Sequence, residues 1–336
     1  MRIGVIGAGR IGVSHAHTLA RIDGVDEVLV ADVEPKRAAD LVASVGAPHV
    51  RAAAVGDLLE RGAVEGLVIA ASTAAHTELL LAAVATKTPA FCEKPVAADI
   101  AGTVNVRDAI EAAGILVQMG FQRRFDAGHV AVREAVASGE LGRLHTVRSQ
   151  TLDPAPPPAA YIRTSGGIFR DCCVHDFDAI RWLTGVEIAE VYATGANRAE
   201  PFFAEYGDVA TAACLLTLAD GTLAHVAATR HNAAGYDVRC EALGQTGSVA
   251  AGLGRATPLR LVGPDALAPD RTAYTGFGDR FADAYAAELA AFVARIGSGG
   301  PSPCTVDDAL LAFYVAEAAE RSRSERRPVE LAEVVK

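Results

Sequence analysis

The chain of 336 residues lacks the features that mark several classes of protein. It has no local cluster of Lys and Arg, and its formal net charge is −10 at pH 7, whereas binding to nucleic-acid phosphates needs a basic surface. No apolar run reaches the roughly 18 residues that a membrane-spanning helix requires. We therefore expect neither a nucleic-acid-binding protein nor a membrane protein.

Cysteine is also sparse. The six cysteines show neither the spacing of a disulfide framework nor that of a zinc site. The first residues, MRIGVIGAG, are typical of a strand that enters a glycine loop, and this apolar stretch is too short for a signal peptide. The expectation is a cytoplasmic protein without a disulfide scaffold and without a bound metal.

The first 120 residues contain an alternation of short apolar runs and helix-like segments. We expect strands at 2–6, 26–32, 64–70, 89–92 and 115–118, and helices at 10–22, 35–45, 76–85 and 100–113. The strand segments are continuously apolar, as in a parallel sheet covered on both faces. Residues 1–120 are therefore predicted to form a Rossmann α/β domain with a doubly wound parallel sheet.

The character of the sequence changes after about residue 120. A proline-rich loop at 151–158 precedes strand-like segments between 190 and 262, the last at 259–262. Asp220-Gly221 between two apolar runs indicates a hairpin. Helices are expected at about 280–296 and 306–320, the second with Thr305 and Asp308 as a capping box. Residues 121–336 are predicted to form an α+β domain with a large, open, mainly antiparallel sheet, whose last helices could pack back on the first domain.

A glycine loop follows the first expected strand, where Gly7, Gly9 and Gly12 form the pattern G-x-G-x-x-G around Arg10 and Ile11. The first glycine permits a tight turn, the second admits a pyrophosphate, and the third lets the helix pack on the sheet. The helix N-terminus adds unpaired N–H groups and a positive dipole end. The loop is predicted to bind a dinucleotide.

Asp32 ends the second expected strand, twenty residues after Gly12. Its carboxylate can bind both ribose hydroxyls and would repel a 2′-phosphate, so the sequence favours NAD over NADP. Lys36 and Arg37 lie close by and weaken that preference.

Other strand ends of an open α/β sheet face the same ligand. Ser72 and Thr73 follow the strand at 64–70, and Glu93 and Lys94 follow the strand at 89–92, so all four are expected near the cofactor. His76 lies just past Ser72 and Thr73 and is interpreted as a residue at the start of a helix. It is included among the expected cofactor-binding residues and not among the catalytic ones. Lys94 could stabilise an alkoxide that develops on a substrate.

The stretch GGIFRDCCVHDFDAIRWLTG, at 166–185, combines acidic residues, a histidine and two cysteines. On a helical wheel, Asp171 and His175 lie one turn apart, together with Asp178 and Trp182. An apolar stripe occupies the opposite side, formed by Val174, Phe177, Ile180 and Leu183. The pair of Asp171 and His175 suits general-base chemistry, with a helix cap and a core histidine as the structural alternatives.

Adjacent cysteines point apart on a helix, so Cys172 and Cys173 do not complete a zinc site with His175.

The glycine loop, CEKP at 92–95, and GG-x-x-x-D-x-x-x-H-x-x-D at 166–178 resemble the glucose–fructose oxidoreductase/inositol dehydrogenase/MocA-like (Gfo/Idh/MocA) family. Within it, the stretches at 117–129, 235–247 and 279–293 are similar to inositol 2-dehydrogenases. The resemblance implies NAD-dependent oxidation of a secondary alcohol on a cyclic polyol or sugar. It maps the catalytic residues onto Lys94, Asp171 and His175.

By the same resemblance, the substrate residues would be Lys94, Arg124, Asp153, Asp171, His175 and Tyr236, and Gln122 would join the cofactor set. The chain departs from some inositol dehydrogenases at 151–154, where it has TLDP in place of HRNP. The substrate therefore stays open among myo-inositol, scyllo-inositol and a sugar derivative.

The functional alternatives are an aldose dehydrogenase, an NAD-dependent glycosidase-type relative and a non-enzymatic NAD-sensing regulator. An open sheet face usually needs covering, so we expect a homo-oligomer, either a dimer or a tetramer.

Overall fold

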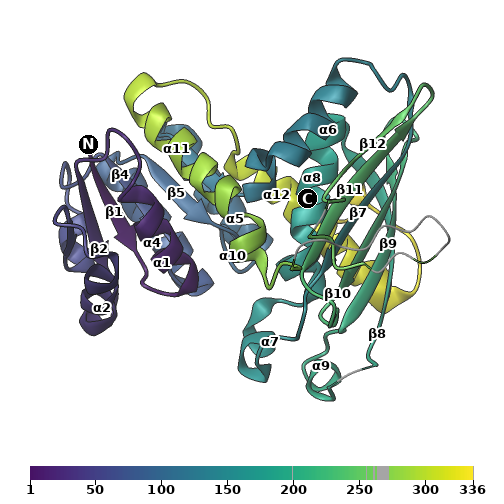
Figure 1. Ribbon diagram of the computed structural model, residues 1–336, viewed down its shortest axis with the longest axis horizontal. Coiled ribbons are helices and arrows are strands. Elements are labelled where there is room, and N and C mark those ends of the chain that lie inside the picture. Colours follow the sequence, from purple (N-terminus) through teal and green to yellow (C-terminus); the bar gives the residue numbers. More distant parts are fainter. Residues whose placement is uncertain (199, 255, 260–261, 263–271, 336) are drawn as a thin grey trace. The chain divides into compact units, whose positions relative to one another are not determined.

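The computed structural model describes residues 1–198, 200–254, 256–259, 262 and 272–335 (Figure 1). The chain divides into two compact units. Unit 1 comprises Met1–Phe125 and Asp283–Leu310, and unit 2 comprises Asp126–Ala282 and Leu311–Lys336. Part of the strand expected at 259–262, namely 260–261, lies outside the described residues.

Unit 1 contains a six-stranded parallel sheet in the order β3-β2-β1-β4-β5-β6, which is the strand order of dinucleotide-binding α/β folds. Its strands are β1 (Arg2–Ile6), β2 (Glu27–Ala31), β3 (Val50–Ala52), β4 (Gly66–Ile69), β5 (Ala90–Glu93) and β6 (Val117–Gly120). Its helices are α1 (Arg10–Leu19), α2 (Pro35–Val45), α3 (Val55–Leu58), α4 (Thr73–Thr86), α5 (Ile100–Ala113) and the 3₁₀ turn η1 (Gln122–Phe125). The predicted Rossmann fold is confirmed.

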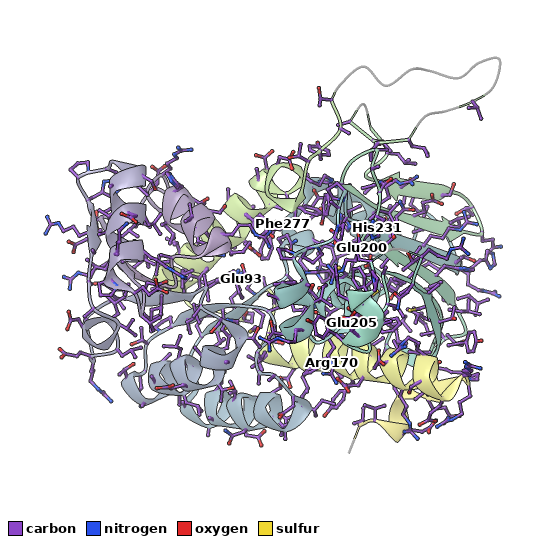
Figure 2. The ribbon with its side chains drawn as sticks, turned by 90° about the horizontal axis from the view of Figure 1, so that it is seen from below. Glu93, Arg170, Glu200, Glu205, His231 and Phe277 are labelled. Atoms are coloured by element: carbon purple, nitrogen blue, oxygen red, sulfur yellow. The ribbon has the colours of Figure 1, made fainter. Side chains whose placement is uncertain are left out.

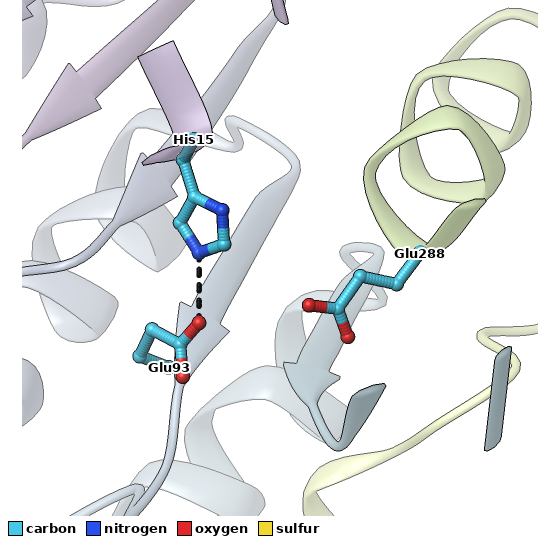
Figure 3. Close-up of side chains that lie close together, drawn as sticks. All are labelled: His15, Glu93 and Glu288. Carbon is cyan, nitrogen blue, oxygen red and sulfur yellow. Dashed lines mark hydrogen bonds and ion pairs between the residues drawn. The ribbon is translucent and has the colours of Figure 1, made fainter. Parts of the chain in front are cut away.

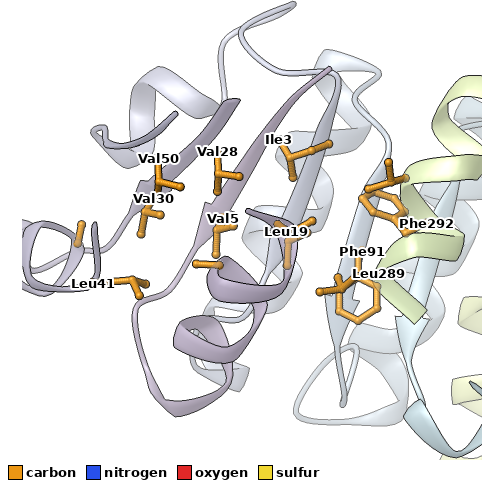
Figure 4. Packing of buried hydrophobic residues seen from close by; sticks show 14 residues of the cluster. Ile3, Val5, Leu19, Val28, Val30, Leu41, Val50, Phe91, Leu289 and Phe292 are labelled. Carbon is orange, nitrogen blue, oxygen red and sulfur yellow. The ribbon is translucent and has the colours of Figure 1, made fainter. Parts of the chain in front are cut away.

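Most of helix α11 (Ala282–Ser298) also belongs to unit 1, although it lies far along the sequence. Its residues Leu289 and Phe292 pack into one core cluster with side chains of β1, β2, β4 and β5 and of helices α1 and α2 (Figure 4). A Cβ atom at Gly66 of β4 would lie 2.5 Å from Ile296, so the strand needs glycine where this helix crosses it. The core of unit 1 is thus completed by a distant helix.

Unit 2 contains a seven-stranded sheet in the order β12-β11-β7-β10-β9-β8-β13. Its strands are β7 (Leu144–Leu152), β8 (Ile188–Ala196), β9 (Thr211–Leu218), β10 (Leu223–Thr229), β11 (Asp237–Gly244), β12 (Ser248–Ala251) and β13 (Val329–Glu330). Neighbouring strands are antiparallel except β7 and β10, which run parallel. The predicted mainly antiparallel sheet and the hairpin at Asp220-Gly221 are confirmed.

The remaining helical segments are α6 (Ala127–Ala137), α7 (Ala159–Ser165), the π-helical turn η2 (Phe169–Cys173), α8 (Val174–Thr184), α9 (Phe202–Glu205), α10 (Phe277–Arg280), α12 (Val306–Glu325) and the 3₁₀ turn η3 (Leu331–Glu333). Thr305 and Asp308 exchange the hydrogen bonds of the predicted capping box at the start of α12. No helix in the described ranges combines the length and apolar character needed to cross a membrane.

One face of the unit 2 sheet is buried and the other is exposed. Along β9 and β10, burial alternates residue by residue, as expected for a sheet covered on one side. Helices α6 and α8 pack together and against β7, β11 and β12. The exposed face carries Tyr192, Leu215 and Leu223, each more than two-fifths exposed.

Candidate functional site

The glycine loop meets the steric conditions for a bound dinucleotide. Gly7 has φ +108°, and a Cβ atom there would lie 2.5 Å from the carbonyl oxygen of Ala70. A Cβ at Gly12 would lie 1.8 Å from the carbonyl oxygen of Gly7, so helix α1 can approach the first strand only through glycine. A Cβ at Gly9 would meet no atom within 4 Å, which leaves open space at the N-terminus of α1, beside the exposed Arg10 and the half-buried Ile11.

The carboxylate of Asp32 is oriented by the same loop. Its Oδ2 accepts a hydrogen bond from the backbone N–H of Ala8 at 2.8 Å, and its Oδ1 accepts one from Glu34 at 2.9 Å. The nearby cations are engaged elsewhere, since Lys36 pairs with Asp40 and Arg37 pairs with Glu34. This arrangement suits a ribose diol better than a 2′-phosphate.

The other cofactor candidates of unit 1 follow its parallel strands at their carboxyl ends. Ser72 and Thr73 lie at the start of α4, after β4, and Ser72 is exposed. His76 is buried, and its ring nitrogens lie 2.6 Å from the carbonyl oxygen of Pro95 and 3.1 Å from that of Ala71. Any contact between His76 and a dinucleotide would therefore involve the ring carbons.

Lys94 directly follows β5 and is half-buried, and Glu93 is the last residue of that strand. Gln122 and Arg124 come from η1, after β6, and both are buried. Arg124 forms an ion pair with Asp308 at 3.0 Å. Because parallel strands end at one edge, the candidate residues of unit 1 gather there.

In unit 2 the segment that carries Asp171 and His175 is not one regular α-helix, which corrects the uniform helix assumed when this stretch was placed on a helical wheel. Asp171 lies in the π-helical turn η2, and α8 begins only at Val174. His175 is half-buried, whereas Asp176 and Asp178 are fully buried. The helix is covered on most sides because it packs between α6 and β7, so its polar residues do not form a solvent-facing side.

Asp176 is an example of a polar residue of this helix that faces the protein interior, because its carboxylate is hydrogen-bonded there. It accepts hydrogen bonds from Ser149 at 2.5 Å and from Thr151 at 2.8 Å, both on β7. The hydroxyl groups offset the cost of burying this carboxylate.

Arg230 links two of the predicted site residues. Its Nη2 donates to Oδ2 of Asp171 at 2.7 Å, and its Nη1 donates to Oδ2 of Asp153 at 3.0 Å. The hydroxyl group of Tyr161 donates to the other oxygen of Asp171 at 2.9 Å. Burial raises the pKa of Asp153, although the charge of Arg230 acts in the opposite direction. The structure thus joins Asp153 and Asp171 through a buried arginine.

The sheet explains why these residues meet. Asp153 follows β7 and Arg230 follows β10, and these parallel neighbours end side by side, with Leu152 opposite Thr229. Tyr236 precedes β11, which pairs antiparallel with β7, so it lies at the same edge; it is buried against the ring of Phe281.

The residue after Arg230, His231, lies 2.9 Å from Glu200 and ties the end of β10 to a neighbouring loop (Figure 2).

The sequence reasoning missed Arg230 and Tyr161. A signal for Arg230 was present, because Ala224, Val226 and Ala228 are the inward positions of the alternating strand and residue 230 continues their parity. A charged residue at an inward position needs a buried partner. For Tyr161 we find no comparable signal in the sequence.

Comparison with known proteins identifies both parts of the chain. Residues 1–121 match the family described as "Oxidoreductase family, NAD-binding Rossmann fold". Residues 129–250 match the family described as "GFO/IDH/MocA C-terminal domain". Together these matches cover most of the sequence.

Full-length relatives and a solved structure agree with these matches. The chain is 39% identical to myo-inositol dehydrogenase Hyg17 of Streptomyces leeuwenhoekii, over 96% of this chain and 97% of that protein. It is 36% identical to the myo-inositol 2-dehydrogenase of Thermotoga maritima over the full length of both. The crystal structure of scyllo-inositol dehydrogenase from Lactobacillus casei, with bound NAD(H) and scyllo-inositol, matches with a TM-score of 0.86 at 29% identity and 99% coverage of each chain.

Proposed function

The chain belongs to the GFO/IDH/MocA oxidoreductase family, and from that premise we propose that it oxidises a secondary alcohol of myo- or scyllo-inositol to the ketone, with NAD as the oxidant. The observation that carries this proposal is similarity over the whole chain to dehydrogenases named for these cyclitols. The steric openness at Gly9 and the orientation of Asp32 support the choice of NAD.

We assign the proton transfer to His175, whose imidazole takes the proton from the reacting hydroxyl group. The ammonium group of Lys94 stabilises the alkoxide that forms as this proton leaves. NAD, when bound, supplies the acceptor for the hydride that leaves the same carbon. The oxidised carbon thus loses one hydride and its oxygen loses one proton, which gives a ketone.

Asp171 supports this chemistry as a fixed carboxylate. Tyr161 donates a hydrogen bond to one carboxylate oxygen of Asp171, and Arg230 donates to the other. A carboxylate oxygen can accept more than one hydrogen bond. We propose that Asp171 accepts a further hydrogen bond from a substrate hydroxyl or from His175. The cost of holding this charge in a nearly buried place is offset by Arg230.

The test is reduction of NAD and NADP against a panel of inositols and aldoses, with the product identified. We expect NADH and an inosose, whereas a glycosidase-type relative would release a free sugar without net NADH. Lys94→Ala and His175→Ala should lower turnover by about 10²–10⁴-fold while NAD still binds. Near wild-type turnover in either variant would contradict its assigned role.

Matched controls exist for both variants. Lys87 is exposed directly after α4 and His145 is exposed on β7, so Lys87→Ala and His145→Ala should keep wild-type turnover. If an aldose were oxidised faster than every inositol, the cyclitol assignment would be replaced by the aldose alternative.

We also propose a homo-oligomer, a dimer or tetramer, formed through the exposed face of the unit 2 sheet. Tyr192 on β8 and Leu215 on β9 are register neighbours and are each 43% exposed, so adjacent strands present apolar area together. Light scattering after gel filtration tests this. Leu215→Glu should shift the mass toward the monomer, and a monomeric wild-type protein would contradict the proposal.

A further inference from the structure

Three titratable side chains from distant parts of the sequence meet inside unit 1: His15 of α1, Glu93 of β5 and Glu288 of α11. One ligand-type atom of each lies within 4.8 Å of the others. His15 and Glu288 are fully buried. Figure 3 shows the carboxyl group of Glu288 pointing from α11 toward the other two, while Nε2 of His15 and Oε1 of Glu93 are hydrogen-bonded at 2.7 Å.

The charge of this cluster has to be balanced within the protein. In the described part of the chain, neither carboxylate oxygen of Glu288 has a hydrogen-bond partner. An isolated, buried carboxylate is too costly to remain ionised, so the group takes up a proton or pairs with a cation. Burial, together with the nearby charge of Glu93, raises the pKa of Glu288 well above its ordinary value.

A shared metal ion fits the geometry poorly. With bond lengths of about 2.0 Å, two ligands of a tetrahedral zinc ion lie about 3.3 Å apart. The separation of 2.7 Å between His15 and Glu93 is shorter and is that of a hydrogen bond. One bridging water, with two hydrogen bonds of about 2.8 Å, spans about 4.6 Å and suits the wider gap to Glu288.

We propose that Glu288, as the neutral acid, and His15 are positioning residues for Glu93, the residue that precedes Lys94. His15 donates a hydrogen bond directly to the carboxylate of Glu93, and Glu288 donates to it through one water. This inference rests on the proposed function only in giving Lys94 its catalytic role. Glu93 ends β5, so holding its side chain holds the backbone from which Lys94 projects.

The surroundings restrict both carboxyl groups. A Cβ atom at Gly120 of β6 would lie 3.0 Å from Oε2 of Glu93, so the strand next to β5 leaves just enough room for this side chain. The side-chain amide of Gln118, also on β6, donates to the backbone oxygen of Glu288 at 2.8 Å and fixes α11 at this point. The cluster therefore couples α11 to the end of β5.

The experiment compares Glu288→Gln with Glu288→Leu. Glutamine has nearly the shape of the neutral acid and can still donate a hydrogen bond, whereas leucine fills the space without a donor. We expect E288Q to keep kcat within about twofold and E288L to lose about tenfold or more in kcat, with little change in the dissociation constant of NAD. Equal loss in both variants, or no loss in either, would overturn the proposal.

A second readout does not depend on identifying the substrate. The chain has only four lysines, so reductive ¹³C-methylation gives a simple NMR spectrum in which the Lys94 signal is the one missing from Lys94→Arg. E288L should move that signal and E288Q should leave it in place. If no polyol reduces NAD but the signal moves as expected, the proposed function fails while this inference stands.

Two further experiments test whether the cluster binds a metal ion and provide for the case that E288L does not fold. Elemental analysis and titration with Zn²⁺ or Mn²⁺ should show no stoichiometric ion, and one equivalent that is lost in E288Q would establish a metal site and overturn the proposal. If E288L does not fold, Gly120→Ala provides a second test of the proposal. The added methyl group on β6 would lie against the carboxylate of Glu93 and should displace the Lys94 signal. An unmoved signal in a folded Gly120→Ala protein would count against the proposal.

Discussion

Arg230 donates a hydrogen bond of 2.7 Å to Asp171 and thereby connects the strand edge of unit 2 with the π-helical turn before α8. The same guanidinium group holds Asp153, one of the residues at which this chain departs from some inositol dehydrogenases. A substrate that contacts either carboxylate therefore contacts a group whose orientation Arg230 sets.

Replacing Arg230 by lysine should lower kcat by about tenfold or more, because an ammonium group cannot bridge two carboxylates in the geometry of a guanidinium fork. The matched control is Arg181→Lys, which alters a similarly buried arginine in a bidentate pair with the exposed Glu187, away from Asp171. Steady-state kinetics and thermal unfolding of both variants check this. Equal losses of kcat would show that Arg230 contributes only to stability.

Two glycines of one loop should respond differently to the same substitution. Gly9→Ser adds a side chain in open space at a helix N-cap, where serine is favoured, so stability should be unchanged while NAD binding weakens by about tenfold or more. Gly12→Ser places its Cβ against the carbonyl oxygen of Gly7 and should cost about 3 kcal/mol of stability. Calorimetric titration with NAD and thermal unfolding distinguish the two effects, and unchanged NAD affinity in Gly9→Ser would contradict the loop assignment.

Asp32→Ser should reduce the preference for NAD over NADP. The loss of hydrogen bonds to a charged acceptor should weaken NAD binding by about tenfold or more, and removal of the carboxylate ends its repulsion of a 2′-phosphate. Asp57→Ser is the control, since Asp57 is exposed and also accepts a backbone hydrogen bond at a helix start. The ratio of kcat/KM for the two cofactors is the measurement, and an unchanged ratio would refute the assignment of Asp32.

The pH dependence of stability should carry a contribution from Asp126. Burial alone would raise the pKa of Asp126, but hydrogen bonds from His129 and Arg280 outweigh it and hold the pKa well below its ordinary value. A depressed pKa stabilises the fold above the unfolded value of about 3.9, and the contribution is lost as the pH falls below it. Asp126→Asn should therefore lose about 3 kcal/mol at neutral pH and progressively less below about pH 4.

Asp99→Asn is the control for this prediction. Asp99 also caps a helix through its side chain, but it is exposed and takes part in no ion pair within the described residues. Its substitution should change the unfolding temperature little and equally at each pH. A pH-independent difference between Asp126→Asn and the wild type would rule out the proposed linkage.

Much of unit 1 could be predicted because its signals are local. Proline at the start of α2 and Gly46 after it mark that helix, and its observed bounds are those expected from the sequence. Strand β7 was missed because its inward positions include Ser149 and Thr151, which break the apolar pattern. These hydroxyls face Asp176, a partner far along the chain, and local periodicity does not contain that information.

The residues of the candidate site also divide into those that have a local signal in the sequence and those that do not. Lys94, Asp171 and His175 were predicted because short motifs carry them, whereas Arg230 and Tyr161 reach Asp171 through tertiary contacts. The π-helical turn also escaped the sequence analysis, since a helical wheel assumes a uniform rotation per residue.

The return of α11 to unit 1 has a consequence for synthesis on the ribosome. Leu289 and Phe292 cover part of the first sheet, yet they are translated only after the strands of unit 2 from β7 to β12. Until then the nascent first unit keeps an uncovered apolar surface, the kind of surface that chaperones bind and that drives aggregation. A fragment that stops before residue 283 should therefore be held by chaperones or precipitate, although it contains the whole glycine loop.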